Sequence, residues 1–261
     1  GVGKTTTAVN LGVSLVQQGK KVLLIDADAQ ANLTMALGYN RPDDIPITLS
    51  TVMQNIIDDK TLDVSQGIIH HSEGVDLLPS NIEMSGFEVR LINAMSRERV
   101  LKTYVNEVKK NYDYVLIDCM PSLGMITINA LAAADSVIIP TQPHYLSAKG
   151  LELLLRSVSM VKRQINPKLR IDGILMTMVM PRTNISKEIT ATVKSAYGKK
   201  IKVFDTEIPH SIRAVEATAE GKSIFAYDKS GKVAAAYEQL GKEVAEIGEK
   251  QRNQNRADRI R

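Results

Sequence analysis

The chain has 261 residues, of which 44% are hydrophobic, so it can bury a substantial core in one large domain or two small ones. Tryptophan is absent and aromatic residues make up only 4%, which argues against aromatic stacking as the main means of binding bases. A single cysteine excludes a disulfide framework and fits a reducing compartment. No run of about 18 apolar residues indicates a membrane span.

The net charge of +4 is confined to one end of the chain. The segment from Lys250 to Arg261 carries five basic residues and one acidic residue, which accounts for the whole excess. Residues 1–249 are therefore neutral overall, and any surface there that binds nucleic acid must come from local clustering of basic side chains. We expect residues 1–249 to form a single domain and residues 250–261 to form a disordered basic tail.

The chain opens on a motif that holds phosphate groups, a glycine-rich turn followed by Lys-Thr at the start of a helix. In such a turn the backbone N–H groups and a lysine ammonium contact the phosphates, and a threonine hydroxyl ligates Mg²⁺. The predicted contacts come from Gly1, Val2, Gly3, Lys4, Thr5 and Thr6. A P-loop ordinarily follows a buried strand, so we expect the first strand and the front of the loop to be missing from this chain.

Apolar runs and helical periodicity alternate along the rest of the chain. The apolar runs predict strands over Lys21–Asp26, Val75–Pro79, Tyr112–Asp118, Ser136–Thr141, Ile171–Val179 and Lys202–Phe204. The helical spacing predicts helices over Thr5–Gln18, Thr48–Ile57, Ile82–Leu91, Arg97–Lys110, Met125–Ala133, Ala148–Ile165, Ser186–Tyr197 and Lys229–Glu249. This alternation predicts an α/β fold, a doubly wound and mostly parallel sheet flanked by helices, as in P-loop NTPases.

Polar residues stand at the ends of three of these strands. In open α/β sheets, sites lie at the carboxyl ends of the strands, so Asp26, Asp118 and Thr141 should meet near Lys4. Asp118 ends an apolar strand in the pattern of a Walker B motif, whose aspartate holds Mg²⁺ through water. Asp26 is placed to support the Mg²⁺ shell and Thr5. Asp28 either orients an attacking water or belongs to a polar turn that caps a helix from Asn32.

Three stretches of the chain carry a family resemblance. They are GVGKTTTAVNLGVSLVQQGKKVLLIDADAQANLT, YDYVLIDCMPSLGMITINALAAADSVIIPTQPHYLSAKGLELL and EIPHSIRAVEA, in that order. Together they resemble the ParA/Soj chromosome- and plasmid-partitioning ATPases, which belong to the deviant-Walker-A group that also contains MinD. The resemblance covers essentially the whole chain.

The resemblance implies a bacterial, cytoplasmic, nucleoid-associated ATPase that uses ATP and Mg²⁺. It implies a homodimer formed with ATP that binds double-stranded DNA without sequence preference, and a ParB-like partner that stimulates hydrolysis. In this family's pattern Lys4 is the phosphate lysine, Thr5 the Mg²⁺ ligand, Thr6 a phosphate contact, Asp28 the water-positioning carboxylate and Asp118 the Walker B acid. The Asp118–Gly124 loop is the γ-phosphate-sensing switch.

Two further segments resemble those that surround the adenine of the nucleotide in this family. They are Thr177–Asn184 and Pro209–Glu216. The resemblance therefore assigns Arg182 and Pro209 to nucleotide binding, and Arg182 and Arg213 to DNA binding. The signature lysine of the family would lie two residues before Gly1. The family often has proline where Ala29 and Met120 stand. We expect these two differences to weaken the conformational switching of their loops without abolishing it.

Two other functions remain open on the sequence alone. A MinD-like membrane-associated ATPase needs a C-terminal amphipathic helix, yet the only large apolar residue from Gly248 to Arg261 is Ile260, so we expect no membrane binding. An ATP-dependent small-molecule enzyme on the same fold, such as an amidoligase, would need a substrate-pocket motif, and none is visible. Cys119 and the four histidines have no metal-ligand spacing and are expected to serve packing or loops.

Overall fold

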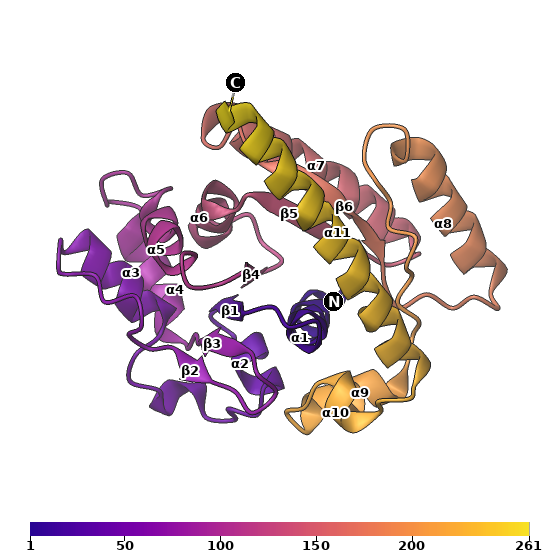
Figure 1. Cartoon of the computed structure of the whole chain (residues 1–261), viewed down its shortest axis with the longest axis horizontal. Helices are drawn as coiled ribbons and strands as arrows, with labels where there is room; N and C mark the ends of the chain where they lie inside the picture. Colours follow the sequence, from indigo (N-terminus) through magenta and orange to yellow (C-terminus); the bar gives the residue numbers. More distant parts are fainter. Residues whose placement is uncertain (261) are drawn as a thin grey trace.

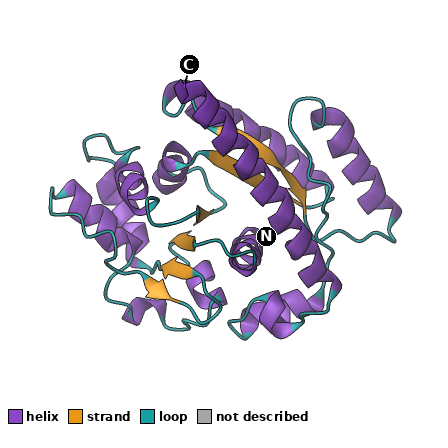
Figure 2. Ribbon diagram, viewed as in Figure 1, coloured by secondary structure: helices purple, strands orange, loops and turns teal. Residues whose placement is uncertain are grey.

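The structure of the protein is a computed structural model that describes residues 1–260, with the side chains of residues 146, 148, 149 and 255–260 outside the description. It contains two parallel-strand assemblies (Figures 1 and 2). The first has the order β2-β3-β1-β4, with β2 (Ile69–His70), β3 (Asp76–Leu78), β1 (Val22–Ala27) and β4 (Tyr114–Cys119). The second pairs β5 (Ser136–Thr141) with β6 (Arg170–Met176). Only the β2–β3 pair is antiparallel.

Helices cover both faces of the first sheet, as expected for a doubly wound fold. One face carries α1 (Lys4–Gln17) and the long helix α11 (Lys232–Ile260). The other face carries α3 (Leu49–Ile57), α4 (Glu83–Leu91), α5 (Val100–Val108) and α6 (Met125–Ala133). The helices α7 (Tyr145–Gln164) and α8 (Asn184–Tyr197) pack against β5 and β6. Four short helices complete the chain: α2 (Asn32–Ala36), η1 (Pro42–Asp44), α9 (Ile212–Ala219) and α10 (Ile224–Tyr227).

Strand β1 lies at the centre of the first sheet, and all six of its residues are buried. Side chains alternate between the two faces of a strand, so Val22 and Leu24 pack toward α1 and α11, whereas Leu23 and Ile25 pack toward α3 to α6. A strand that is buried on both faces reads as a continuous apolar run, which is why the sequence identified β1 correctly.

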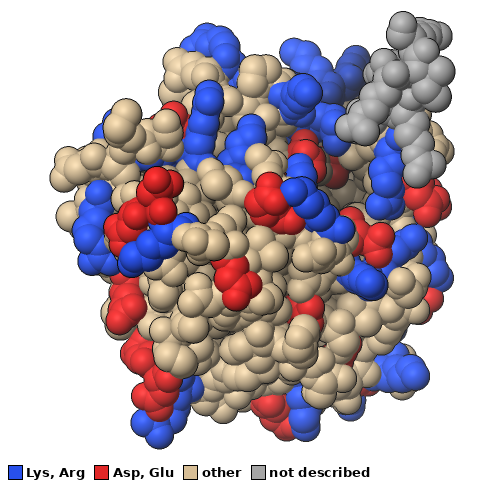
Figure 3. Space-filling view, turned by 60° about the vertical axis from the view of Figure 1, so that its left-hand side comes forward, with Lys and Arg blue, Asp and Glu red and all other residues tan. Residues whose placement is uncertain are grey.

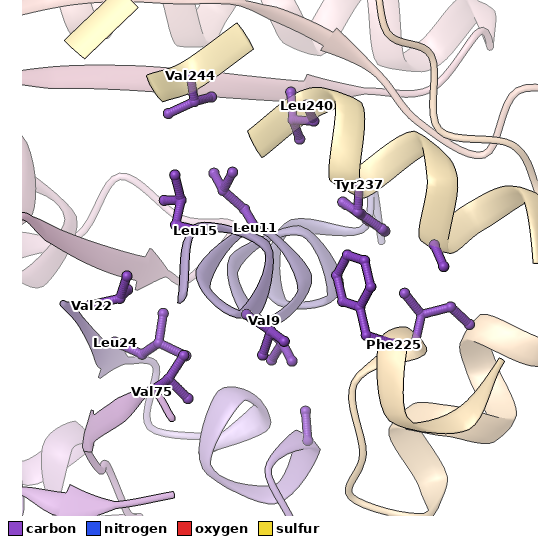
Figure 4. Packing of buried hydrophobic residues seen from close by; sticks show 14 of the residues in the cluster. Val9, Leu11, Leu15, Val22, Leu24, Val75, Phe225, Tyr237, Leu240 and Val244 are labelled. Atoms are coloured by element: carbon purple, nitrogen blue, oxygen red, sulfur yellow. The ribbon is translucent and has the colours of Figure 1, made fainter. Parts of the chain in front are cut away.

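Helix α1 is held between the sheet and α11. Its Leu11 and Leu15 lie on the side that faces α11, opposite Leu240 and Val244 (Figure 4). Leu15 is fully buried, and burying a leucine contributes about 2 kcal/mol. The hydroxyl groups of Thr7 and Tyr237 lie 3.3 Å apart across the same interface. This packing fixes the position of the start of α1, where the predicted phosphate site lies.

The predicted fold class is confirmed, but the sheet differs from the expectation in its continuity. Strands β4 and β5 are not paired with one another in the described part of the chain, so the sheet divides between them. The predicted strand Lys202–Phe204 is wrong in extent, because only Val203 forms a bridge, to Ile174 of β6. The sequence also did not predict β2, α9 or α10, which are too short for a periodic pattern.

Helix α11 extends beyond its predicted end at Glu249 and includes residues 250–260 of the basic segment. The division into a domain of residues 1–249 and a disordered tail remains a prediction, and Arg261 lies outside the described residues. Within the described residues, no helix is long and apolar enough to cross a membrane.

We expect Gly221→Ala to lower the free energy of unfolding by about 2–4 kcal/mol. Gly221 has φ +66°, and a Cβ atom there would lie 2.3 Å from the Cα atom of Gly38, a backbone atom that cannot yield. Chemical denaturation measures the change. The matched control is Gly150→Ala, because Gly150 lies in α7 with no atom near the added methyl group. That change should raise stability by up to about 1 kcal/mol, and equal effects at the two positions would contradict the prediction.

Candidate functional site

The start of α1 is built to receive an anion. Gly3 occupies the position before the helix with φ +73°, a conformation that glycine adopts without strain. No side chain caps this end, and the first turn contains no acidic residue. The N–H groups of the first turn are therefore free of side-chain partners and carry the positive end of the helix dipole, which favours a phosphate there.

A hydrogen bond joins this helix end to the end of strand β4. The hydroxyl group of Thr5 donates to Oδ2 of Asp118 over 2.6 Å. Asp118 is 4% exposed and lies beside Asp26, its partner in the parallel pairing of β1 with β4. The structure thus brings Thr5, Asp118 and Asp26 together at the carboxyl ends of the strands.

Both carboxyl groups are harder to ionise than usual. Burial raises the pKa of Asp118 from 3.8 to about 6, against the opposing influence of the Thr5 hydroxyl and the nearby Lys4 ammonium. Burial likewise raises the pKa of Asp26 from 3.8 to about 7, although Thr34 donates two hydrogen bonds that favour its charged form. Neighbouring acids raise both pKa values further, because like charges repel. Asp118 raises the pKa of Asp26, and Asp28 raises the pKa of Asp118.

Asp26 braces the loop that follows β1. It accepts hydrogen bonds from the backbone N–H of Asp28 and from both the backbone and the hydroxyl of Thr34, at 3.1, 2.9 and 2.7 Å. Among the described residues, the Thr5 hydroxyl donates to Asp118 rather than to Asp26. Support of Thr5 by Asp26 therefore remains a prediction. A role for Asp26 in holding Mg²⁺ remains a prediction.

Asp28 closes a polar turn ahead of α2. Its Oδ1 accepts from the backbone N–H of Gln30 at 2.9 Å, and its Oδ2 accepts from the Asn32 side chain at 3.3 Å. The predicted polar turn is therefore present, but it does not cap α2, whose N-cap residue is Ala31 and which has no side-chain cap hydrogen bond. An ionised carboxylate has about four acceptor sites, so these two contacts leave others for a water molecule. The position of Asp28 is therefore compatible with a role in the turn and with orienting an attacking water.

The donor set fits a magnesium ion bound together with phosphates. Mg²⁺ in nucleotide sites is held by one or two carboxylates, hydroxyl groups and substrate phosphates rather than by a full set of protein ligands. Asp118 and Thr5 supply such a carboxylate and hydroxyl. Among the described residues, no group of three or more histidines, cysteines, aspartates or glutamates could hold a metal ion alone.

The two segments assigned to the adenine lie side by side. Val179 and Pro209 form a parallel bridge, in which the Val179 N–H donates to Ile208 and the His210 N–H donates back to Val179. Arg182 follows this bridge in an exposed loop, and Arg213 follows it in the first turn of α9. The Nη1 atom of Arg213 lies 3.3 Å from Oδ1 of Asp228, and the Arg213 side chain is 62% exposed. Both arginines are therefore accessible at neighbouring ends of the paired segments.

Sequence reasoning did not predict the contacts that three polar residues make in this region. Thr34 holds Asp26, whereas Gln142 and Thr177 hold the phosphate loop: Gln142 donates to the carbonyl of Gly1 at 2.7 Å, and Thr177 donates to that of Val2 at 2.9 Å. Gln142 and Thr177 directly follow β5 and β6, so their position at strand ends was the available signal. Cys119 behaves as expected, since burial raises the pKa of its thiol to about 12 and keeps it protonated.

The comparisons with known proteins agree with this geometry. A family model described as an AAA domain matches residues 1–171. The sporulation initiation inhibitor protein Soj of Bacillus subtilis is 43% identical over 249 residues, which cover 95% of each chain. The chromosome partitioning protein ParA of Myxococcus xanthus is 38% identical over 246 residues, which cover 94% of this chain and 84% of that protein.

Solved structures share the fold. A crystal structure described as cobyrinic acid a,c-diamide synthase from Mycobacterium smegmatis, with bound ATP analogue and magnesium, matches with a TM-score of 0.81 and 33% identity. The match covers 93% of this chain and 88% of the synthase chain. The cell division ATPase MinD of Pyrococcus furiosus matches with a TM-score of 0.73 over 95% of this chain and 94% of its own. At 24% identity, that match shows the fold alone.

We expect Asp118→Asn to remove a pH dependence from the stability of the nucleotide-free, Mg²⁺-free protein. The folded pKa of Asp118 lies above its unfolded value of 3.8, so the folded state keeps this proton to higher pH. Its contribution to the free energy of unfolding is therefore greatest below about pH 4 and is lost as pH rises through about 6, a change of about 2–3 kcal/mol. Urea denaturation of both proteins between pH 4 and pH 7.5 measures the difference, and parallel pH curves would contradict the assignment.

Proposed function

Because the chain belongs to the ParA/Soj family of P-loop ATPases, we propose that it hydrolyses ATP with Mg²⁺ to drive the segregation of chromosomal or plasmid DNA. The observation that carries this proposal is the Thr5–Asp118 hydrogen bond in front of the uncapped start of α1. We further propose that it dimerises with ATP, binds duplex DNA without sequence preference at the bacterial nucleoid, and is stimulated by a ParB-like partner.

Each residue of the site has a distinct task in this proposal. The Lys4 ammonium and the N–H groups of Gly1–Thr6 hold the phosphates. The Thr5 hydroxyl donates its hydrogen to Asp118. The lone pairs of the Thr5 oxygen therefore point away from the carboxylate and are free to bind a cation. When bound, Mg²⁺ neutralises charge on the phosphate oxygens. Asp28 orients a water molecule with the acceptor sites that Gln30 and Asn32 leave open.

The base and the DNA are assigned to the paired segments beyond β6. Pro209 forms the bridge with Val179, Arg182 follows that bridge in the chain, and both contact the nucleotide in this proposal. Arg182 and Arg213 also contribute to the DNA surface. Residues 1–249 carry no net charge, and the face shown in Figure 3 bears acidic side chains among its basic ones. A single monomer in this proposal therefore offers few phosphate contacts. Dimerisation doubles those contacts and makes DNA binding depend on ATP.

A second candidate function follows from the likeness to the diamide synthase structure. Such an enzyme needs a substrate cavity beside the phosphate loop. A hollow of about 440 Å³ lies between α7 and α8, lined by Leu155, Arg156, Met160, Arg163 and Tyr197 among others, and no residue of the phosphate loop lines it. Stimulation of ATP hydrolysis by cobyrinic acid, rather than by DNA with a ParB-like protein, would favour this function.

The MinD-like membrane function is less well supported. In the sequence from Gly248 to Arg261, Ile260 is the one large apolar residue, which is too little to insert into a bilayer. Co-sedimentation with anionic vesicles in the presence of ATP tests it. Binding to vesicles would favour the MinD-like function over segregation.

We expect Asp28→Ala and Asp28→Asn to bind ATP and dimerise normally while turnover falls by about 10²–10⁴-fold, because water loses its orienting carboxylate. Lys4→Ala is the contrasting variant, since loss of its charge removes ATP binding itself. Calorimetry, light scattering and phosphate release measure binding, assembly and turnover. Asp28→Asn keeps an acceptor for the Gln30 N–H, so normal turnover in this variant would reduce Asp28 to a turn residue.

We expect Arg213→Ala to lose most DNA binding while ATP-dependent dimerisation remains, because two arginines leave the dimer surface. The slope of log K against log salt should fall by about two, one phosphate per subunit. Arg156→Ala is the matched control, since Arg156 is also exposed and paired with an acid, Glu152, but lies on α7. Retardation assays over a salt series with ATP or ADP measure both. Equal binding with ADP and ATP, or equal losses in the two variants, would contradict the proposed surface.

A further inference from the structure

Two side chains from the second sheet hold the backbone of the phosphate loop. Gln142, which follows β5, donates from Nε2 to the Gly1 carbonyl over 2.7 Å. Thr177, which follows β6, donates from Oγ1 to the Val2 carbonyl over 2.9 Å. Thr177 is 1% exposed, so this bond is shielded from bulk solvent. The loop is therefore anchored to a different sheet from the one that supplies Asp118.

These two contacts fix two consecutive peptide planes. A trans peptide is planar, with its C=O and N–H groups pointing in opposite directions. Gln142 holds the Gly1 carbonyl and so orients the N–H of Val2, and Thr177 holds the Val2 carbonyl and so orients the N–H of Gly3. Both peptides adjoin glycines, whose backbones otherwise rotate freely. The side chains thereby turn the Val2 and Gly3 N–H groups away from the β5–β6 sheet.

The hydroxyl of Thr177 has a second carbonyl within reach, that of Thr141, which does not depend on it alone. The Thr141 carbonyl lies 3.2 Å from the same hydroxyl, but it also accepts the backbone N–H of Thr177 at 2.8 Å. Of the two carbonyls within reach of the hydroxyl, that of Val2 is the nearer, at 2.9 Å.

The residue after Thr177 reinforces this arrangement. Met178 has φ +53°, a left-handed conformation that costs a non-glycine residue about 1 kcal/mol or more and persists only where its surroundings fix it. Its Sδ lies 2.7 Å from Nε2 of Gln142. Its Cε lies 3.5 Å from the point where a Cβ would stand at Gly3. The segment that begins at Thr177 is thus packed against the loop by side chain as well as by hydrogen bond.

We propose that Thr177 and Gln142 are positioning residues that aim the N–H groups of Val2 and Gly3 at the phosphates of the nucleotide. This inference rests on the proposed function, since it assigns the loop to a nucleotide. It makes the segment from Thr177 to Asn184 contribute to phosphate binding as well as to the base. Phosphate affinity then depends on a side chain that does not itself touch phosphate.

The test compares Thr177→Val, which removes the hydroxyl at nearly constant shape, with Thr177→Ser, which keeps it. Calorimetry in Mg²⁺ measures the affinity for ATP and for inorganic tripolyphosphate, which has phosphates but no base. We expect Thr177→Val to weaken both ligands by the same factor, about five- to tenfold, and Thr177→Ser to restore both. The control is Thr190→Val, because the buried Thr190 hydroxyl has no hydrogen-bond partner among the described residues. It should leave both affinities unchanged.

Each outcome bears on a different statement. A wild-type protein that binds neither ligand would overturn the proposed function and this inference with it. If the wild type binds ATP, unchanged affinities in Thr177→Val would overturn the inference alone, as would a loss for ATP without a loss for tripolyphosphate. If Thr177→Val unfolds in a thermal scan, Gln142→Leu provides the test instead. This change removes the hydrogen bond to the Gly1 carbonyl at a residue that is only partly buried. It should again weaken both ligands equally, and unchanged affinities would overturn the inference.

Discussion

The hydrogen bond between Thr5 and Asp118 is the contact on which the site depends. It joins the first turn of α1 to the last residues of β4, and both elements are fixed independently by the core. Helix α1 is held by apolar packing against α11 and β1, and β4 is held by its register with β1. A shift of either element by one residue would separate the hydroxyl from the carboxylate. The apolar core therefore sets the geometry of a polar site that contributes little apolar burial of its own.

The same register places two buried acids side by side. Asp26 and Asp118 are partners across β1 and β4, and burial raises the pKa of each. Ionised carboxylates in such a position are costly unless cationic or hydrogen-bonding groups compensate them. Thr34, Thr5 and Lys4 compensate in part, yet the pKa values stay high. A divalent cation would complete the compensation, which gives a physical reason for coupling between Mg²⁺ binding and stability at neutral pH.

The sequence predicted those parts whose pattern extends over many residues. Strand β1 and strand β4 contain apolar runs that end in aspartate, and α1 has a clear helical period. Together they predict that Asp118 lies near the start of α1, and its hydrogen bond with Thr5 shows that it does. Prediction failed where an element is too short to show a pattern, or where a contact joins residues distant in sequence. Strand β2 has two residues and exists only through its pairing with β3. Thr34, Gln142 and Thr177 are ordinary polar residues in composition, and only the fold shows that they lie against Asp26, Gly1 and Val2.

The phosphate loop is thus attached to both halves of a divided sheet. Thr5 links it to β4 in the first sheet, whereas Gln142 and Thr177 link it to the ends of β5 and β6 in the second. The second sheet also leads into the Val179–Pro209 bridge, beyond which Arg182 and Arg213 stand. A change at the phosphates therefore has a short covalent and hydrogen-bonded route to both arginines: from the loop through Thr177 to Val179, and across the bridge to Pro209 and α9. If the proposed DNA binding holds, that route would give it a physical basis for depending on the bound nucleotide, because the same backbone segments that orient the loop also carry the basic side chains.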